Sequence, residues 1–181
     1  PPVLHAVQLF FAGALAADLG READRSAARG ALRDLGAQLR VDGDSTNARF
    51  ADGAGLALDG RLAWQRGDRA LAERFLEEAR TTATGHGPKW AVNDVVRLWL
   101  GELMVEDGRL HDAEKYFASL WFDPLAYRRL GELYVEMEEP EKAREFYEGF
   151  LTAWRDADPE LQPMVVRVRQ AVAGLTPLRR E

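Results

Sequence analysis

The feature that most restricts the fold of this chain is an internal repeat. Residues 100–106 (LGELMVE) recur as residues 130–136 (LGELYVE). Each Gly is followed twelve residues later by Ala and sixteen residues later by a large apolar residue. The three copies are Gly101, Ala113 and Phe117; Gly131, Ala143 and Tyr147; and, more weakly, Gly60, Ala72 and Leu76. A fixed spacing of this kind indicates a repeat architecture, in which each unit packs on its neighbours.

The spacing has a physical reason in the close packing of two helices. Gly in the first helix and Ala in the second let antiparallel helices approach closely, and we expect the aromatic residue to fill the gap toward the next pair. Gly costs about 1 kcal/mol of helix propensity, so the packing must compensate. Turn signals at residues 66–68, 107–109 and 138–140 follow each repeat Gly, where the first helix should end. Each unit is therefore predicted to be a helix–turn–helix.

These residues resemble the tetratricopeptide repeat (TPR), a helix–turn–helix unit of 34 residues with Leu-Gly and an aromatic in its first helix. The matching residues are Leu130, Gly131, Tyr134, Ala143 and Tyr147, and also Leu100, Gly101, Gly108, Ala113, Phe117 and Pro124. The copy at Gly60 departs from the pattern, since it lacks the aromatic and has Asp59 where the others have Leu. The copies are also unevenly spaced, by 41 and then 30 residues. The resemblance covers residues 46–154.

The resemblance implies an all-α fold, an α-α superhelix or TPR-like solenoid of about four helix pairs plus a C-terminal capping helix. We expect one domain over residues 1–181, with repeat units at 46–84, 88–121 and 123–154. Residues 3–41 are predicted to be a divergent pair, because the offsets after Gly13 fall on Arg25 and Arg29. Large aromatics at helical spacing are usually core, so Trp99 and Trp121 are expected between repeats.

The C-terminal region is predicted to end the array. Residues 158–174, beginning at Asp158-Pro159, should form a helix that caps its open apolar end. One apolar stripe runs along it, through Val165, Val168 and Val172. Residues 150–161 (FLTAWRDADPEL) are also similar to the closing segment of TPR regions in bacterial signalling proteins such as serine/threonine kinases and winged-helix regulators. Because the chain starts at Pro1 without Met, we expect an effector domain to precede it in a longer polypeptide.

Composition excludes several classes of function. There are 24 Lys and Arg against 30 Asp and Glu, a net charge of −6, which argues against a nucleic-acid partner. The chain has no Cys, which removes thiolate metal sites and Cys nucleophiles and is compatible with either redox compartment. No apolar run is long enough to span a membrane, so no membrane insertion is expected. We expect a cytoplasmic location, with the periplasm as the alternative.

Sequence motifs for catalysis, cofactor binding and metal binding are incomplete in this chain. Residues 42–47 begin like a calcium loop, but Asn47 stands where the turn Gly belongs and Gly53 where the bidentate Glu belongs. Residues 53–58 start a dinucleotide fingerprint without its third Gly, and residues 84–89 are Gly-rich without the Lys-Ser/Thr of a phosphate loop. The three histidines fall in different units. We therefore expect no enzyme activity, no cofactor and no metal.

The resemblance implies that function lies in a concave groove lined by the first helices. The expected partner-binding residues are Ala57, Arg61, Trp64, Gln65, Leu98, Glu102, Val105, Glu106, Leu125, Arg128, Glu132, Val135 and Glu136. This mixture of apolar and acidic groups suits a peptide or protein with basic and apolar side chains. The expected function is thus a protein–protein interaction module, a scaffold, adaptor or sensory part of a larger bacterial protein.

Two other interpretations stay open. The chain could self-associate, so that a groove or an uncapped end dimerises a signalling protein. Alternatively, the glutamates are ordinary solvated residues on a structural spacer, as charged helical faces usually are.

Overall fold

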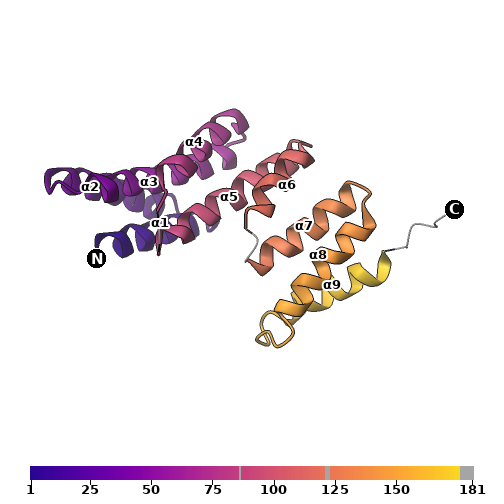
Figure 1. Cartoon of the computed structure of the whole chain (residues 1–181). Coiled ribbons are helices and arrows are strands. Elements are labelled where there is room, and N and C mark those ends of the chain that lie inside the picture. Colours follow the sequence, from indigo (N-terminus) through magenta and orange to yellow (C-terminus); the bar gives the residue numbers. More distant parts are fainter. Residues whose placement is uncertain (86, 121–122, 176–181) are drawn as a thin grey trace. The chain divides into compact units, whose positions relative to one another are not determined.

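The computed structural model describes residues 1–85, 87–120 and 123–175, and all regular structure in these ranges is α-helical (Figure 1). The all-α prediction is confirmed. The helices are α1 (Pro2–Asp18), α2 (Glu22–Val41), α3 (Ser45–Gln65), α4 (Arg69–Thr82), α5 (Lys89–Glu106), α6 (Leu110–Ala118), α7 (Pro124–Glu136), α8 (Pro140–Ala153) and α9 (Gln162–Gly174).

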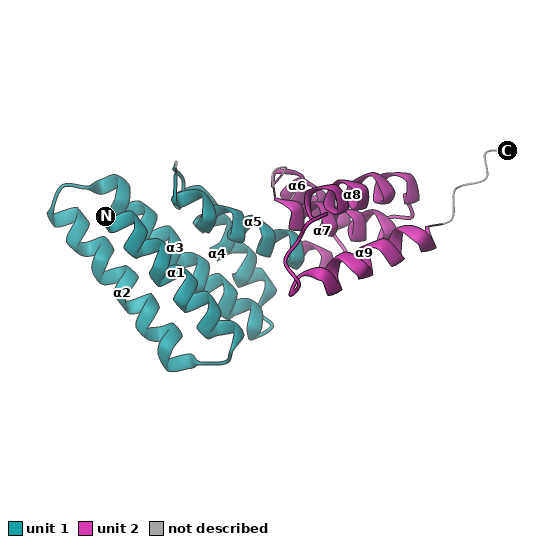
Figure 2. Ribbon diagram, turned by 90° about the horizontal axis from the view of Figure 1, so that it is seen from below, with its two compact units in different colours: residues 1–103 teal, residues 104–181 magenta. Residues whose placement is uncertain are grey.

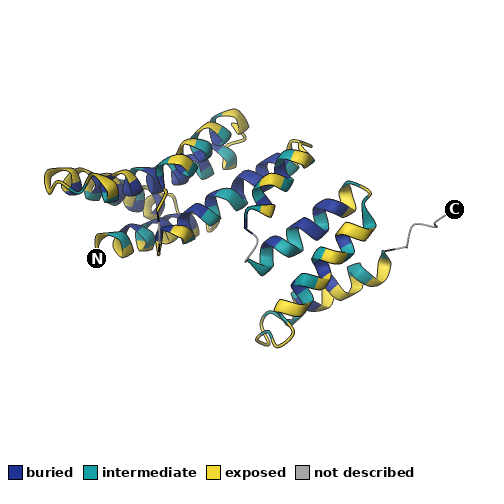
Figure 3. Cartoon of the chain, viewed as in Figure 1, coloured by how far each residue is buried: buried dark blue, intermediate teal, exposed yellow. Residues whose placement is uncertain are grey.

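The chain divides into two compact units, residues 1–103 and 104–181 (Figure 2). In the first unit, α3 is the central helix and packs against α1, α2 and α4. In the second, α7 packs against α6 and α8, and α9 packs on α8. Buried residues lie along the sides of the helices that face one another (Figure 3). Trp99 is buried, as predicted, and Trp121 lies outside the described residues.

Two of the repeat glycines, Gly60 and Gly131, lie directly beneath the large residue sixteen positions later. A Cβ at Gly60 would come within 2.8 Å of Leu76 Cγ, and a Cβ at Gly131 would overlap the ring of Tyr147. The large residue therefore rests on the Gly of its own helix pair. Tyr147 also lines a cleft with Met164 and Arg167 of α9. The Arg129 guanidinium of α7 lies 5.5 Å from the ring centroid of Phe117, so these aromatic residues also reach the helix that follows their own pair.

The turns within the helix pairs, and the turn that joins the first pair to the second, share one backbone arrangement. After α1, α2, α3 and α5, a glycine takes positive φ, and the next N–H bonds back to a carbonyl inside the helix. This is the Schellman motif, which satisfies helix carbonyls that would otherwise lack a partner. After α7 the same place is held by Glu138 at φ 59°, and the N–H of Glu139 bonds to the carbonyl of Tyr134 at 2.8 Å.

This turn yields a stability prediction, because the left-handed conformation costs an ordinary residue roughly 1–2 kcal/mol and costs Gly little. Replacing Glu138 with Gly should raise the free energy of unfolding by about 0.5–1 kcal/mol, after the extra freedom of Gly in the unfolded chain is deducted. Gly108→Ala, at φ 71°, should lower the free energy by a similar amount. Urea unfolding of the two variants measures both. Equal stability of Glu138→Gly and the unsubstituted protein would contradict the assignment of strain to this turn.

The last helix begins later than the sequence suggested. The Asp158-Pro159 start is wrong: residues 158–161 form a turn, in which the N–H of Leu161 bonds to the carbonyl of Asp158 at 2.9 Å, and α9 begins at Gln162. Pro163 explains the shift, because in a helix started at Pro159 it would lack a donor and collide with the carbonyl four residues earlier. In the first turn of α9 it is tolerated. Val165 and Val168 are buried, and Val172 is half-buried.

Candidate functional site

In the first unit, the expected binding residues of α3 lie on a face that joins three helices. The Arg61 guanidinium pairs with Asp18 at the end of α1, with Nη2 2.7 Å from Oδ1. It also stacks on Trp64, 4.7 Å from the ring centroid, and on Trp99 of α5, at 5.4 Å. The structure therefore brings Arg61 and Trp64 together, and most of Arg61 is used to hold α1, α3 and α5 to one another.

The other expected residues of this unit differ in access. Gln65 is exposed, and its side-chain amide donates a hydrogen bond to the carbonyl of Ala17 at 2.9 Å. Leu98 and Glu102 on α5 are half-buried. Ala57 is fully buried, so its assignment to a binding face is wrong. The reason is local, because α3 is covered by three neighbouring helices and has little free surface.

In the second unit, the expected residues of α7 form a charge cluster. Arg128 and Arg129 lie four and three residues before Glu132, so both can pair with its carboxylate on the same side of the helix. The three side chains are between 19% and 32% exposed. The Nε of Arg128 is buried without a hydrogen-bond partner among the described residues. The negative charge of Glu132 is therefore offset by the two arginines.

Tyr147 of α8 forms the floor of this cluster. A cleft of about 110 Å³ is lined by Arg128, Glu132 and Tyr147, and by α9 side chains that include Met164 and Arg167. Burial, with a smaller contribution from the charge of Glu132, raises the pKa of Tyr147 to about 12. The phenol is thus neutral at physiological pH and serves as packing against Gly131.

Tyr134 of α7 is also held by contacts within the second unit. Its hydroxyl donates a hydrogen bond to Glu114 Oε1 at 2.6 Å, linking α7 to α6. Burial, followed by that hydrogen bond, raises the pKa of the Tyr134 phenol well above its usual range. Its ring stacks on Phe146 at 5.3 Å between centroids. Both tyrosines of the repeat pattern are therefore structural.

The end of α7 provides the more open part of the expected face. Val135 is 45% exposed, Glu136 is exposed, and no ion pair to Glu136 occurs among the residues that the structure describes. Leu125, at the start of the same helix, is half-buried. On α5, Val105 is half-buried and Glu106 is exposed. These positions offer both apolar and acidic groups.

The sequence interpretation missed a cationic cleft between α2 and α3. It has a volume of about 360 Å³, and the arginines at positions 25, 29 and 33 line it from one face of α2. Arg29 bonds to Asp59 of α3 through Nε at 2.9 Å and Nη2 at 2.8 Å. A signal was present, because Arg25 and Arg29 occupy the repeat positions of Ala and the aromatic, and Asp59 replaces the repeat Leu. Two of these departures, Arg29 and Asp59, are partners of one another.

A second missed feature is an exposed apolar row on α1. It consists of Leu4, Phe11 and Leu15, with Leu19 directly after the last residue of the helix, and these are 44%, 41%, 61% and 56% exposed. Their spacing in sequence places them on one side of the helix. The signal for this row was the lack of Asp, Glu, Lys and Arg before Asp18.

Within residues 1–85, 87–120 and 123–175, no three His, Asp or Glu side chains are grouped so as to hold a metal ion. Across the same ranges, the structure has no helix that is long and apolar enough to cross a membrane. No protein-family model matches the chain, and no curated protein matches its sequence.

Proposed function

We propose that the chain is a protein-interaction module built as a TPR-like superhelix of four helix pairs closed by α9. The observation that supports this most is the repeated contact between a first-helix Gly and the residue sixteen positions later, at Gly60 with Leu76 and Gly131 with Tyr147. It shows that the sequence repeat corresponds to a repeated mode of packing between paired helices. Stacked units of this kind expose a long helical surface, and that surface is where such proteins bind their partners.

The surface offered by α7 favours a peptide with basic and apolar side chains. Val135 supplies an exposed apolar contact, and Glu136 beside it supplies a negative charge. Glu132 is already paired with Arg128 and Arg129, so it contributes less to attraction than its charge suggests. Through the resemblance of residues 150–161, the module is a scaffold or sensory part of a larger bacterial signalling protein, in the cytoplasm.

The test is binding to an array of synthetic twelve-residue peptides that vary in Lys/Arg and Leu/Phe content. We expect basic apolar peptides to be retained and acidic peptides to be rejected, with binding that weakens as salt screens the charges. The double variant Val135→Lys, Glu136→Lys should weaken retention by roughly tenfold, since close complementary charges and a desolvated apolar contact each contribute on the order of 1 kcal/mol or more.

A matched variant controls for the change in net charge. Glu141→Lys with Glu148→Gln, both exposed on α8, raises the net charge by three, as Val135→Lys with Glu136→Lys does, and neither residue is among the expected binding residues. Retention should stay within about twofold in this variant. If no class of peptide is retained, or if both variants lose binding equally, the proposal fails.

Self-association is a second candidate, because the apolar row on α1 suits contact with another copy of the chain. Rows of this kind on a surface mark interaction sites. Light scattering across a range of concentrations separates the two functions. A stable dimer that forms without peptide, and that Leu15→Glu converts to a monomer, would favour self-association over peptide binding.

A further inference from the structure

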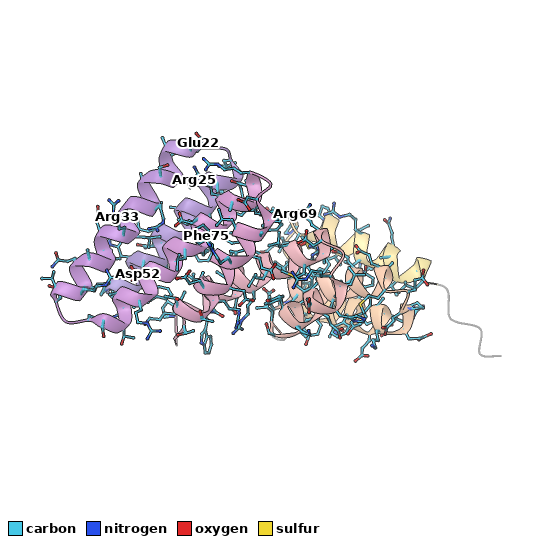
Figure 4. The ribbon with its side chains drawn as sticks, turned by 90° about the horizontal axis from the view of Figure 1, so that it is seen from above. Glu22, Arg25, Arg33, Asp52, Arg69 and Phe75 are labelled. Carbon is cyan, nitrogen blue, oxygen red and sulfur yellow. The ribbon has the colours of Figure 1, made fainter. Side chains whose placement is uncertain are left out.

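The cationic cleft of the first unit is distinct from the surface proposed to bind peptides. It lies between α2 and α3, and a second cleft of about 330 Å³ adjoins it, sharing Arg25 and Leu62. Figure 4 looks onto this side of the unit and labels Arg25 and Arg33 on α2. Together the two clefts are lined by five arginines and only two carboxylates, in a chain whose net charge is −6.

Arg25 is the central residue of this site. It is only 8% exposed, and no hydrogen bond or ion pair joins its guanidinium to any residue that the structure describes. The guanidinium nitrogens are not fully enclosed, since the fully buried side-chain polar atoms without a partner among the described residues are Asn93 Oδ1 and Arg128 Nε, so the charge of Arg25 faces the solvent of the clefts. Since Arg25 lines both clefts, an anion held in either of them is within its reach and would supply the missing partner.

Arg29 is held in place by features of α3. Its guanidinium lies across Gly55, where a Cβ would come within 2.8 Å of Nη1. Asp59 fixes the other side of the guanidinium through bonds from Nε and Nη2 to one carboxylate oxygen. The glycine and the carboxylate together orient Arg29 along the cleft. Arg33 is more open, since its pair with Asp34 is exposed to solvent on both sides.

The chemistry of the cleft suits a phosphate group better than a carboxylate. A carboxylate has two oxygens and is satisfied by a single guanidinium fork, whereas a phosphate monoester has three terminal oxygens and up to two charges. Three guanidinium groups follow one another at four-residue intervals, one turn apart, on the same face of α2. Leu62, which is half-buried, adds apolar surface beside them. The volume is in the range of sites for small molecules.

We propose that this cleft binds the phosphate group of a small organic molecule, with Arg25 and Arg29 as its principal ligands. The apolar part of the molecule rests on Leu62. Arg33 at the rim adds long-range attraction.

Isothermal titration calorimetry of the full chain at constant ionic strength tests the proposal. The probes are phenyl phosphate, inorganic phosphate, benzoate and an acidic peptide of Glu and Leu. We expect saturable binding of phenyl phosphate, at least tenfold tighter than benzoate because of its additional oxygen and charge. Inorganic phosphate should bind more weakly than phenyl phosphate, because it lacks the ring. Tighter binding of the peptide would overturn the proposal in favour of a protein segment as the occupant.

Three substitutions test whether the ligand binds in this cleft, and a fourth is the control. Arg25→Gln should weaken phenyl phosphate binding at least tenfold, and Gly55→Ala should weaken it by displacing Arg29. Asp59→Asn should strengthen binding several-fold, because it removes the carboxylate that competes for Arg29. Arg40→Gln is the matched control on the same helix, since Arg40 pairs with Asp52 outside both clefts, and its affinity should stay within twofold.

Folding is separated from binding by the stability of the ligand-free variants. Arg25→Gln removes a charge that makes no hydrogen bond or ion pair with a described residue, so its thermal midpoint without ligand should stay close to that of the unsubstituted protein. Loss of binding together with an undiminished midpoint supports the site. No saturable binding of phenyl phosphate, or equal affinity in Arg25→Gln and Arg40→Gln, would overturn it. Neither result depends on whether the chain binds peptides.

Discussion

Gly53→Ala is expected to lower the free energy of unfolding of the first unit by about 2–3 kcal/mol, although Ala is the better helix former. A Cβ at Gly53 of α3 would lie 2.5 Å from the backbone nitrogen of Ala83 and 2.9 Å from its Cα. Backbone atoms cannot rotate away as a side-chain end can. Ala83 is itself held, since its N–H bonds to the carbonyl of Ala79 at 2.7 Å and Asn93 donates to its carbonyl. The helices must separate to admit the methyl group.

The matched control for this substitution is Gly30→Ala in the middle of α2. No atom lies within 4 Å of a Cβ placed at Gly30, so only the gain in helix propensity remains. Gly30→Ala should raise the free energy of unfolding by about 0.5–1 kcal/mol. Thermal unfolding followed by circular dichroism measures both, with a midpoint about 10 °C lower for Gly53→Ala. A stabilised Gly53→Ala variant would show that α3 and α4 are not packed at this point.

The contrast between these glycines explains why the sequence revealed the helices better than their packing. Turn residues and the repeated spacing depend on local chemistry, and they predicted the paired helices over residues 46–154. The Gly53-Ala54-Gly55 segment resembled an incomplete dinucleotide-binding motif in the sequence. The residues around it do not indicate which other helix it contacts. The structure places the end of α4 against Gly53 and the side chain of Arg29 against Gly55.

The candidate sites also depend on packing between helices, which the sequence does not reveal. The divergence of Arg25, Arg29 and Asp59 from the repeat was visible along the chain, but their meeting depends on how α2 packs on α3. The pairing of Arg128 and Arg129 with Glu132 is different, since residues three and four apart on a helix are neighbours. That pairing was predictable, and it reduces the negative charge that the peptide surface was expected to carry.

The core of the second unit should be most sensitive at Phe150. Its side chain is fully buried on α8, and its ring lies 5.1 Å from that of Trp154. Phe150→Ala should cost about 3–5 kcal/mol, from the lost burial of the ring and the cavity left behind. A unit of this length is stable by only about 4–12 kcal/mol, so the loss removes much of its stability. Hydrogen exchange of the α7 and α8 amides should accelerate strongly, because small losses in stability multiply the open population.

Phe150→Leu separates the loss of volume from the loss of the aromatic ring. The preceding repeat has Leu120 at the same offset from its Gly, and Leu120 is also buried, so this type of packing accepts Leu. The cost of Phe150→Leu should therefore stay below about 1.5 kcal/mol. The amides of α1–α4 act as the internal reference for both variants, because the first unit is compact by itself. Equal effects of Ala and Leu would mean that the ring, rather than the filled volume, stabilises this part of the chain.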